Sequence, residues 1–124
     1  AENLIDLAAY FENSDYQQIA EKMMQNMKEE FSSFSPNISQ WMQVMGKLAQ
    51  DPIDIAVTGN NSMKLANELQ IYFSPLARYC GGENEDLPLL HGKVKTDKNL
   101  IYVCKNKTCL DPVDSVKAAV DQLQ

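Results

Sequence analysis

The sequence predicts a mixed α/β chain. A helical segment at residues 1–50 precedes a small α/β layer at residues 51–124 with three to four short strands. The spacing of apolar residues predicts this division, because it is about 3.6 before Gln50 and about two from Ile53 onward. The later segments follow in the order strand, helix, strand, strand, helix, which is typical of a helix-covered sheet whose first two strands are parallel.

Three helices account for the first fifty residues. The second helix follows Ser14, which forms the pattern of a capping box with Gln17, and it extends to about Ser33. The third begins at Ser35-Pro36, because proline fits the first turn of a helix, and it ends before Asp51-Pro52. Since the link between them is short, the second and third helices are expected to pack as an antiparallel hairpin.

The helical period also predicts which side chains of these helices face a core. They are Leu4, Leu7 with Ala8, and Phe11 in the first helix, Tyr16, Ile19, Ala20, Met23, Met27, Phe31 and Phe34 in the second, and Ile38, Trp41, Met42, Met45, Leu48 and Ala49 in the third. The charged residues of the second helix fall mostly off this stripe, so the helix is expected to be amphipathic.

The second half of the chain alternates strands and helices. Residues 53–58 are rich in β-branched side chains, and Tyr79-Cys80 resembles a shorter strand that Gly81-Gly82 breaks. Residues 99–104 contain the clearest strand, and Pro112 precedes a last helix. The residues of the two helices expected to face the core are Met63, Ala66, Leu69, Phe73, Val113, Val116, Val120 and Leu123.

Composition excludes two classes of function. The 124 residues carry 11 basic and 17 acidic side chains, and a net charge of −6 argues against a nucleic-acid binder. No apolar run approaches the roughly 20 residues of a membrane helix, so no membrane partner is expected. The chain opens at Ala1 already in a helical pattern, which leads us to expect a fragment of a longer protein.

The cysteines carry the strongest candidate chemistry. If Asn106-Lys107 forms a two-residue hairpin turn, Lys105 faces Thr108. The next pair, Cys104 and Cys109, then falls in a non-hydrogen-bonded position, where side chains approach closely enough to approximate disulfide geometry. Cys104 and Cys109 are therefore a candidate reversible redox pair. The alternative is two reduced, partly buried thiols.

A weaker candidate is the turn between the first strand and the helix that follows it. Its residues are Gly59, Asn60, Asn61 and Ser62. Backbone N–H groups at such a turn can hold an anion, although no phosphate-loop motif is present and a plain reversal of the chain is the alternative. No metal site is expected, because two cysteines and the distant His91 leave a tetrahedral zinc site one ligand short unless Cys80 joins them.

The C-terminal half carries a family pattern. The segment Leu89-Leu90-His91-Gly92-Lys93 is followed by Tyr102-Val103-Cys104, four further residues, Cys109 and Pro112. This order resembles the closing segment of the spermatogenesis-associated protein 20-like family, in which Tyr-Val-Cys, four residues, Cys and a nearby Pro recur. Upstream, Ile55-Ala56-Val57-Thr58-Gly59 is similar to a strand of that family that ends in glycine.

The resemblance implies the C-terminal fragment of a larger protein. Members of the family have an N-terminal thioredoxin-like domain followed by a six-hairpin helical toroid like that of N-acylglucosamine 2-epimerases. Residues 1–50 would then be the last toroid helices, and residues 51–124 a C-terminal α/β extension. The implied partner is the remainder of the parent chain. A toroid cut at this point leads us to expect self-association through the Met-rich helices.

Three functions are open at this point. The first is a non-catalytic structural module that closes the C-terminus of the parent protein. The second is a redox accessory in which Cys104 and Cys109 exchange with the thioredoxin-like domain. The third is the scaffold part of a sugar-modifying, epimerase-like enzyme. We expect no catalytic residue and no cofactor in this segment and a cytoplasmic location, with any enzymatic activity belonging to the full-length parent.

Overall fold

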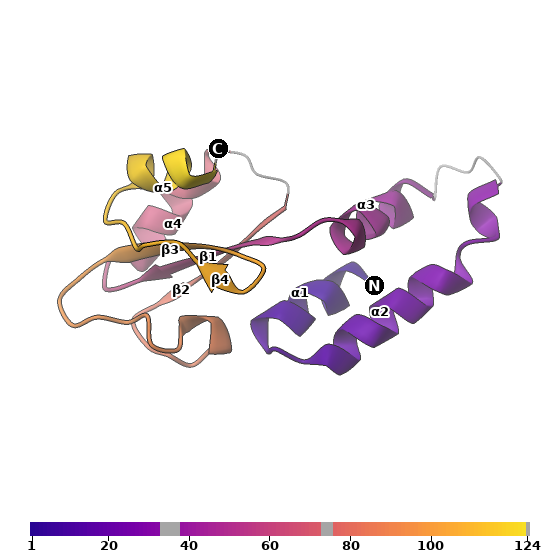
Figure 1. Cartoon of the computed structure of the whole chain (residues 1–124), viewed down its shortest axis with the longest axis horizontal. Helices are drawn as coiled ribbons and strands as arrows, with labels where there is room; N and C mark the ends of the chain where they lie inside the picture. The colour runs from indigo at the N-terminus through magenta and orange to yellow at the C-terminus, as the bar shows by residue number, and fades with distance from the viewer. Residues whose placement is uncertain (33–37, 73–75, 124) are drawn as a thin grey trace. The chain divides into compact units, whose positions relative to one another are not determined.

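The protein is described by a computed structural model that covers residues 1–32, 38–72 and 76–123. The chain divides into two compact units, Ala1–Asp51 and Pro52–Gln124. The first unit contains α1 (Glu2–Tyr10), α2 (Ser14–Asn26), the 3-10 turn η1 (Glu30–Ser32) and α3 (Ile38–Ala49) (Figure 1). The second helix therefore ends earlier than expected, and the predicted start of the third at Ser35-Pro36 lies outside the described residues.

A tight reversal joins α1 to α2. Glu12 takes a positive φ of 50°, and the Asn13 amide donates to the Ala8 carbonyl at 3.0 Å, as in a Schellman motif. Asn13 then caps α2, since its Oδ1 accepts a hydrogen bond from the Asp15 amide at 2.9 Å. The expected cap at Ser14 was wrong by one residue, because Asn13 is the residue with extended backbone before the helix.

The first unit has a small apolar core. Its buried members are Ile5, Ala20, Met24 and Val44, and Ala1, Leu4, Phe31, Trp41 and Leu48 pack against them. Several side chains that the helical period placed inward are instead exposed, namely Leu7, Phe11, Ile19, Met23, Met42 and Met45. These helices carry more apolar residues than one core face holds, so periodicity alone could not select the buried set.

An ion-pair cluster ties α3 to α1. The Lys47 Nζ lies 2.9 Å from Glu2 Oε1 and 3.2 Å from Asp6 Oδ2. Burial lowers the pKa of Lys47, but the hydrogen bonds and charges of Glu2 and Asp6 more than offset this, so the net pKa is raised. All three side chains are partly exposed, and pairs of this kind contribute about 1 kcal/mol or less.

The second unit is built on a four-stranded mixed sheet. Its elements are β1 (Ile53–Thr58), α4 (Ser62–Gln70), β2 (Ala77–Gly82), the 3-10 turn η2 (Pro88–Leu90), β3 (Leu100–Lys105), β4 (Thr108–Cys109) and α5 (Val116–Leu123). The strand order is β2-β1-β3-β4, with β1 parallel to β2 and antiparallel to β3. The chain is thus mixed α/β, with N-terminal helices followed by a four-stranded mixed sheet and interspersed helices. The predicted strand at 53–58 is confirmed.

The glycine pair in β2 does not break the strand. Gly81 and Gly82 belong to β2, opposite Val57 and Thr58 of β1. A Cβ on Gly81 would lie 2.8 Å from the Val57 carbonyl oxygen, closer than real side chains come. The absence of a side chain therefore allows β2 to run beside β1 here, and the expectation that glycine ends the strand was wrong.

Helices α4 and α5 cover one face of the sheet (Figure 1). The core on this face consists of Ile55, Val57, Leu69, Ile101, Val103 and Ala119, all fully buried. Alternate residues of β1 and β3 point into it, as the pleat of a strand requires. Val116, Val120 and Leu123 of α5 pack against this core as predicted, and so does Val113, which lies before the helix and pairs with Ile101. Met63 is exposed instead, and Phe73 lies outside the described residues.

The segment between β2 and β3 covers residues of the opposite face. The Lys93 carbonyl oxygen accepts hydrogen bonds from the Tyr102 hydroxyl at 3.0 Å and from Thr58 Oγ1 at 3.3 Å. Leu90 in η2 is buried as well. This face therefore has its own cover, and it is the face that holds the cysteines of β2 and β3.

Candidate redox site

The cysteine pair is positioned by a two-residue turn. Asn106 and Lys107 both take positive φ, 51° and 62°, as in the type I′ turn whose twist matches that of paired strands. Asn tolerates this conformation, whereas Lys does so at a cost. The expected two-residue turn is confirmed, even though the glycine usual at its second position is replaced by Lys107.

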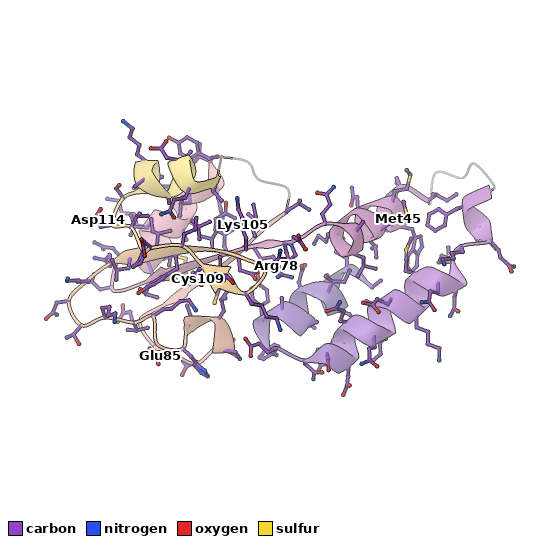
Figure 2. The ribbon with its side chains drawn as sticks, in the orientation of Figure 1. Met45, Arg78, Glu85, Lys105, Cys109 and Asp114 are labelled. Carbon is purple, nitrogen blue, oxygen red and sulfur yellow. A yellow bond between two sulfur atoms is a disulfide. The ribbon has the colours of Figure 1, made fainter. Side chains whose placement is uncertain are left out.

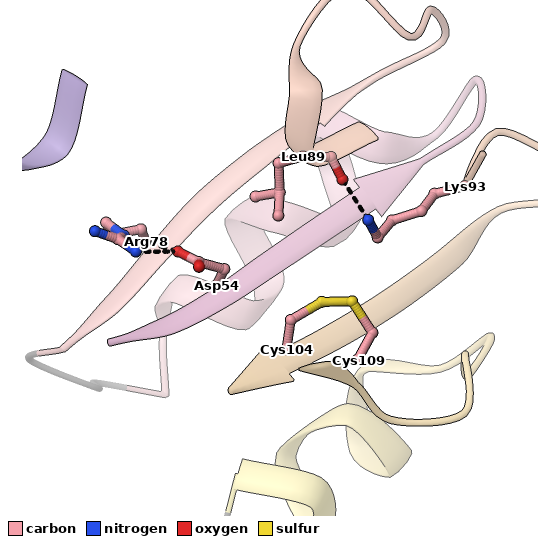
Figure 3. Close-up of a disulfide and its surroundings, with 6 residues drawn as sticks. All are labelled: Asp54, Arg78, Leu89, Lys93, Cys104 and Cys109. Carbon is pink, nitrogen blue, oxygen red and sulfur yellow. Dashed lines mark hydrogen bonds and ion pairs between the residues drawn. A yellow bond between two sulfur atoms is a disulfide. The ribbon is translucent and has the colours of Figure 1, made fainter. Parts of the chain in front are cut away.

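The turn sets the register of the strands that it joins. Lys105 pairs with Thr108, and Cys104 pairs with Cys109. The Leu110 amide donates to the Val103 carbonyl at 2.9 Å, so the cysteine pair falls between two hydrogen-bonded positions. The two Cα atoms are 3.8 Å apart, and the sulfurs form a disulfide (Figure 3). The predicted register is confirmed.

The two half-cystines differ in exposure. Cys104 is 1% exposed and lies on β3, between β1 and β4. Cys109 is half-buried on β4, the last strand in the order (Figure 2). The two residues of the disulfide are therefore unequally exposed to solvent.

An ion pair shares the cross-strand row of the disulfide. Asp54 lies opposite Arg78 of β2 on one side and opposite Cys104 of β3 on the other. The Arg78 Nη2 and Nε both lie 2.7 Å from Asp54 Oδ1, and both side chains are largely buried (Figure 3). The residues in this row, from β2 to β4, are thus Arg78, Asp54, Cys104 and Cys109.

Sequence reasoning did not identify Asp54 and Arg78 as part of the site. The available signal was a carboxylate inside an otherwise apolar strand, since buried carboxylates are normally paired. Its partner could not be named without the parallel register of β1 and β2. That register brings Arg78 from 24 residues away in the sequence.

Cys80 stands apart from the disulfide. It pairs with Ala56 of β1, so β1 lies between the strand of Cys80 and that of Cys104. Its thiol is free and buried. Burial raises the pKa of Cys80; Lys93 lowers it and Asp54 raises it further. Cys80 therefore has the character of a protected, protonated thiol.

The candidate anion turn is occupied by the chain itself. The Asn61 amide donates to Asn99 Oδ1 at 2.8 Å, and the Ser62 amide donates to the Gly59 carbonyl at 3.0 Å. The Gly59 amide donates to the Gly82 carbonyl of β2 at 3.1 Å. Three of the four amides of Gly59, Asn60, Asn61 and Ser62 thus have acceptors within the protein. Anion binding there stays a prediction, with little donor capacity left to support it.

Comparison with known protein families, curated proteins and solved structures finds no match to this chain. Within residues 1–32, 38–72 and 76–123, no three His, Cys, Asp or Glu side chains gather as a metal site would require. No helix in the described part of the chain is both long and apolar enough to span a bilayer. The disulfide hairpin is therefore the arrangement with the clearest chemistry.

Proposed function

We propose that this chain is the C-terminal module of a larger thioredoxin-domain protein and that its Cys104–Cys109 disulfide is a reversible redox element. One observation carries the redox part of the proposal. Cys104 and Cys109 face each other at a non-hydrogen-bonded position of the hairpin and form a disulfide there. The resemblance in sequence supports a parent protein that contains a thiol-exchange domain.

A purely structural role explains this bond less well. Only five positions separate the two cysteines, and closing so short a loop stabilises a folded chain by about 2 kcal/mol. The hairpin is already held by the turn and by the hydrogen bond from Leu110 to Val103. In the cytoplasmic location that we propose, lasting disulfides are rare, and those that form are usually catalytic or redox-sensing.

The redox proposal is tested by equilibration in glutathione buffers of graded potential. Samples are quenched with acid, alkylated and mapped by mass spectrometry, with Cys80 as an internal control in the same chain. We expect Cys104 and Cys109 to change together, with a midpoint above about −300 mV. A midpoint below that value would group the bond with structural disulfides and contradict the proposal.

A second candidate function is favoured by the exposed apolar side chains of the first unit. Phe11, Met42 and Met45 are each about half exposed, and Ile19 and Met23 add to the apolar surface. Such side chains support the proposal that these helices pack against further helices of a parent chain, with the module acting as a scaffold. Whether that parent modifies sugars stays a prediction, which an assay of the full-length protein would test.

Self-association of this chain tests the scaffold proposal. We expect sedimentation velocity to show a mass that rises with concentration, and we expect Met42→Lys together with Met45→Lys to reduce the rise. Met63→Lys is the matched control, because Met63 is exposed in the second unit. A monomer at every concentration would count against an unpartnered helical surface.

A further inference from the structure

Access to the disulfide is asymmetric. The Cys104 residue is 1% exposed, whereas Cys109 is half-buried on the terminal strand of the sheet. Thiol–disulfide exchange requires the incoming thiolate to reach one sulfur in line with the bond that breaks. Attack from solvent on Cys104 is obstructed by its burial, which leaves Cys109 as the residue that a solvent-borne thiol can approach.

The backbone N–H and C=O groups of Cys109 face away from β3. Lys105 and Thr108 form the hydrogen-bonded pair beside the turn, and Leu110 donates to Val103 on the other side. In an antiparallel ladder, the residue between two such pairs directs its N–H and C=O away from the neighbouring strand. Strand β4 ends the strand order of the described residues, so these groups of Cys109 point out from an edge of the sheet.

An edge strand that carries one sulfur of a disulfide suits one kind of partner. Edge strands accept an extended segment of another chain through main-chain hydrogen bonds. A protein that presents such a segment next to its own cysteine would align that thiolate with Cys109. A small thiol has no backbone of comparable length and would gain nothing from the edge.

We propose, building on the redox function above, that reduction begins at Cys109 Sγ and that the reductant is a dithiol protein which pairs an extended segment with β4. Cys104 is then the buried leaving sulfur. The proposal joins the unequal exposure of the two cysteines to the outward-facing backbone of Cys109.

The exchange balances in two steps. The reductant thiolate attacks Cys109 Sγ, the bond between the two cysteine sulfurs breaks, and its electron pair passes to Cys104 Sγ, which takes a proton from water. The second thiolate of the reductant then attacks the reductant sulfur in the mixed disulfide and releases Cys109, which is protonated in turn. The dithiol is oxidised to a disulfide, and the Cys104–Cys109 disulfide is reduced to two thiols.

The first test compares two single replacements. Cys104→Ser leaves Cys109 as a thiol, and Cys109→Ser leaves Cys104. An aromatic disulfide reagent should modify Cys109 in the first variant at least about tenfold faster than Cys104 in the second, because Cys104 is buried and Cys109 is partly exposed. Peptide mapping separates both reactions from that of Cys80. Equal rates, or faster modification of Cys104, would overturn the assignment of the attacked sulfur.

The second test uses mixed disulfides formed at Cys109 in the Cys104→Ser variant, because in the unaltered chain the Cys104 thiol would attack Cys109 Sγ, expel the probe and close the disulfide again. The probes are glutathione and a thioredoxin whose second active-site cysteine is replaced by serine, each supplied as its mixed disulfide with an aromatic thiol. Displacement of the aromatic thiol joins either probe to Cys109. Hydrogen exchange of the Cys109 amide should slow by about tenfold or more in the thioredoxin adduct and stay unchanged in the glutathione adduct. Equal exchange in the two adducts would overturn the edge pairing.

The outcomes separate this inference from the redox function on which it rests. If the disulfide is reduced but Cys104 reacts as fast as Cys109 in the two serine variants, the redox function stands and the inference fails. If the bond resists reduction throughout the glutathione range, the redox function fails. The two serine variants still report which sulfur is accessible in that case, because their reaction does not require the disulfide to open.

Discussion

Asp54 lies directly opposite Cys104 in the register of β1 and β3, and its carboxylate is ion-paired with Arg78 of β2. Reduction of the disulfide would release a sulfur at Cys104 beside this carboxylate. A neighbouring negative charge and burial both disfavour a thiolate, whereas the Arg78 guanidinium favours it. The ion pair between Asp54 and Arg78 is therefore placed to affect how readily Cys104 Sγ departs as the leaving group when the disulfide is reduced.

The first prediction concerns this charge. Asp54→Asn should accelerate reduction by dithiothreitol at neutral pH by about three- to tenfold, because it removes repulsion and leaves the Arg78 cation near the leaving sulfur. The rate is measured by stopping the reaction with acid and counting the thiols that have been released.

The opposite replacement provides the control for that experiment. Arg78→Gln should slow reduction, since Asp54 then acts on Cys104 without a compensating cation. Both variants break the same ion pair, so loosening of the fold alone would accelerate both. Rate changes of the same sign would therefore contradict an electrostatic role.

A second prediction concerns the hairpin turn. Lys107→Gly should stabilise the chain by about 1 kcal/mol, because Lys107 holds a φ of 62° that glycine adopts without steric cost. Urea unfolding of the oxidised chain measures the change. Lys105→Gly, two positions earlier at the end of β3, should destabilise it instead. If both replacements shift stability in the same direction, the left-handed backbone at Lys107 is not the cause.

A third prediction concerns Gly59, which has a φ of +106°. A Cβ there would meet Asn99 Oδ1 and the Lys98 carbonyl oxygen at distances that real side chains do not reach. Gly59→Ala should therefore cost about 3 kcal/mol or more. Gly92→Ala is matched to it, because Gly92 also has positive φ but open space around a Cβ, and it should cost about 1 kcal/mol. Equal losses in thermal unfolding would contradict the close approach of Asn99.

The fourth prediction concerns the buried thiol. Since the pKa of Cys80 is raised in the folded chain, the folded chain binds the thiol proton more tightly than the unfolded chain does. The stability this contributes is fully present below about pH 9, the ordinary value for a thiol, and is lost as pH rises through the raised pKa.

The measurement is the free energy of unfolding at pH 7.5 and pH 10.5, conditions chosen about 1.5 units on either side of the ordinary thiol pKa. We expect the wild-type chain to lose more stability over this interval than Cys80→Ala, in which the titrating group is absent. A Cys80→Ala variant with the same pH dependence as wild type would show that other groups account for the loss.

Local chemistry made the strand of β1 and the hairpin predictable. Ile53–Thr58 is β-branched and bounded by Pro52 and Gly59, so both ends carried a signal. The pairing of Cys104 with Cys109 followed from the length of the turn alone. Each of these features depends on neighbours within a few residues.

The features that the sequence did not predict correctly depend on residues far apart in the chain. Ile19 and Met23 lie on the predicted stripe of α2 but are exposed. Met24, which lies off the stripe, is buried beside the correctly predicted Ala20, because contacts with α1 and α3 select the inward face. The pairing of Asp54 with Arg78 required the parallel register of β1 and β2, which no local pattern encodes. The alternation along a strand predicts which face of the sheet each side chain lies on, but it does not predict which residue of the next strand lies beside it.

The closeness of the two cysteines in the chain bears on the order of events in folding. Hairpins close within microseconds, whereas pairing between strands far apart in the sequence comes later. Oxidation of Cys104 and Cys109 therefore needs only the segment around Asn106-Lys107 and none of β1 or β2. A one-residue slip in the register of this hairpin would turn the two cysteine side chains to opposite faces of the sheet. Early formation of the disulfide would therefore fix β3 and β4 in their native register before the other strands pair.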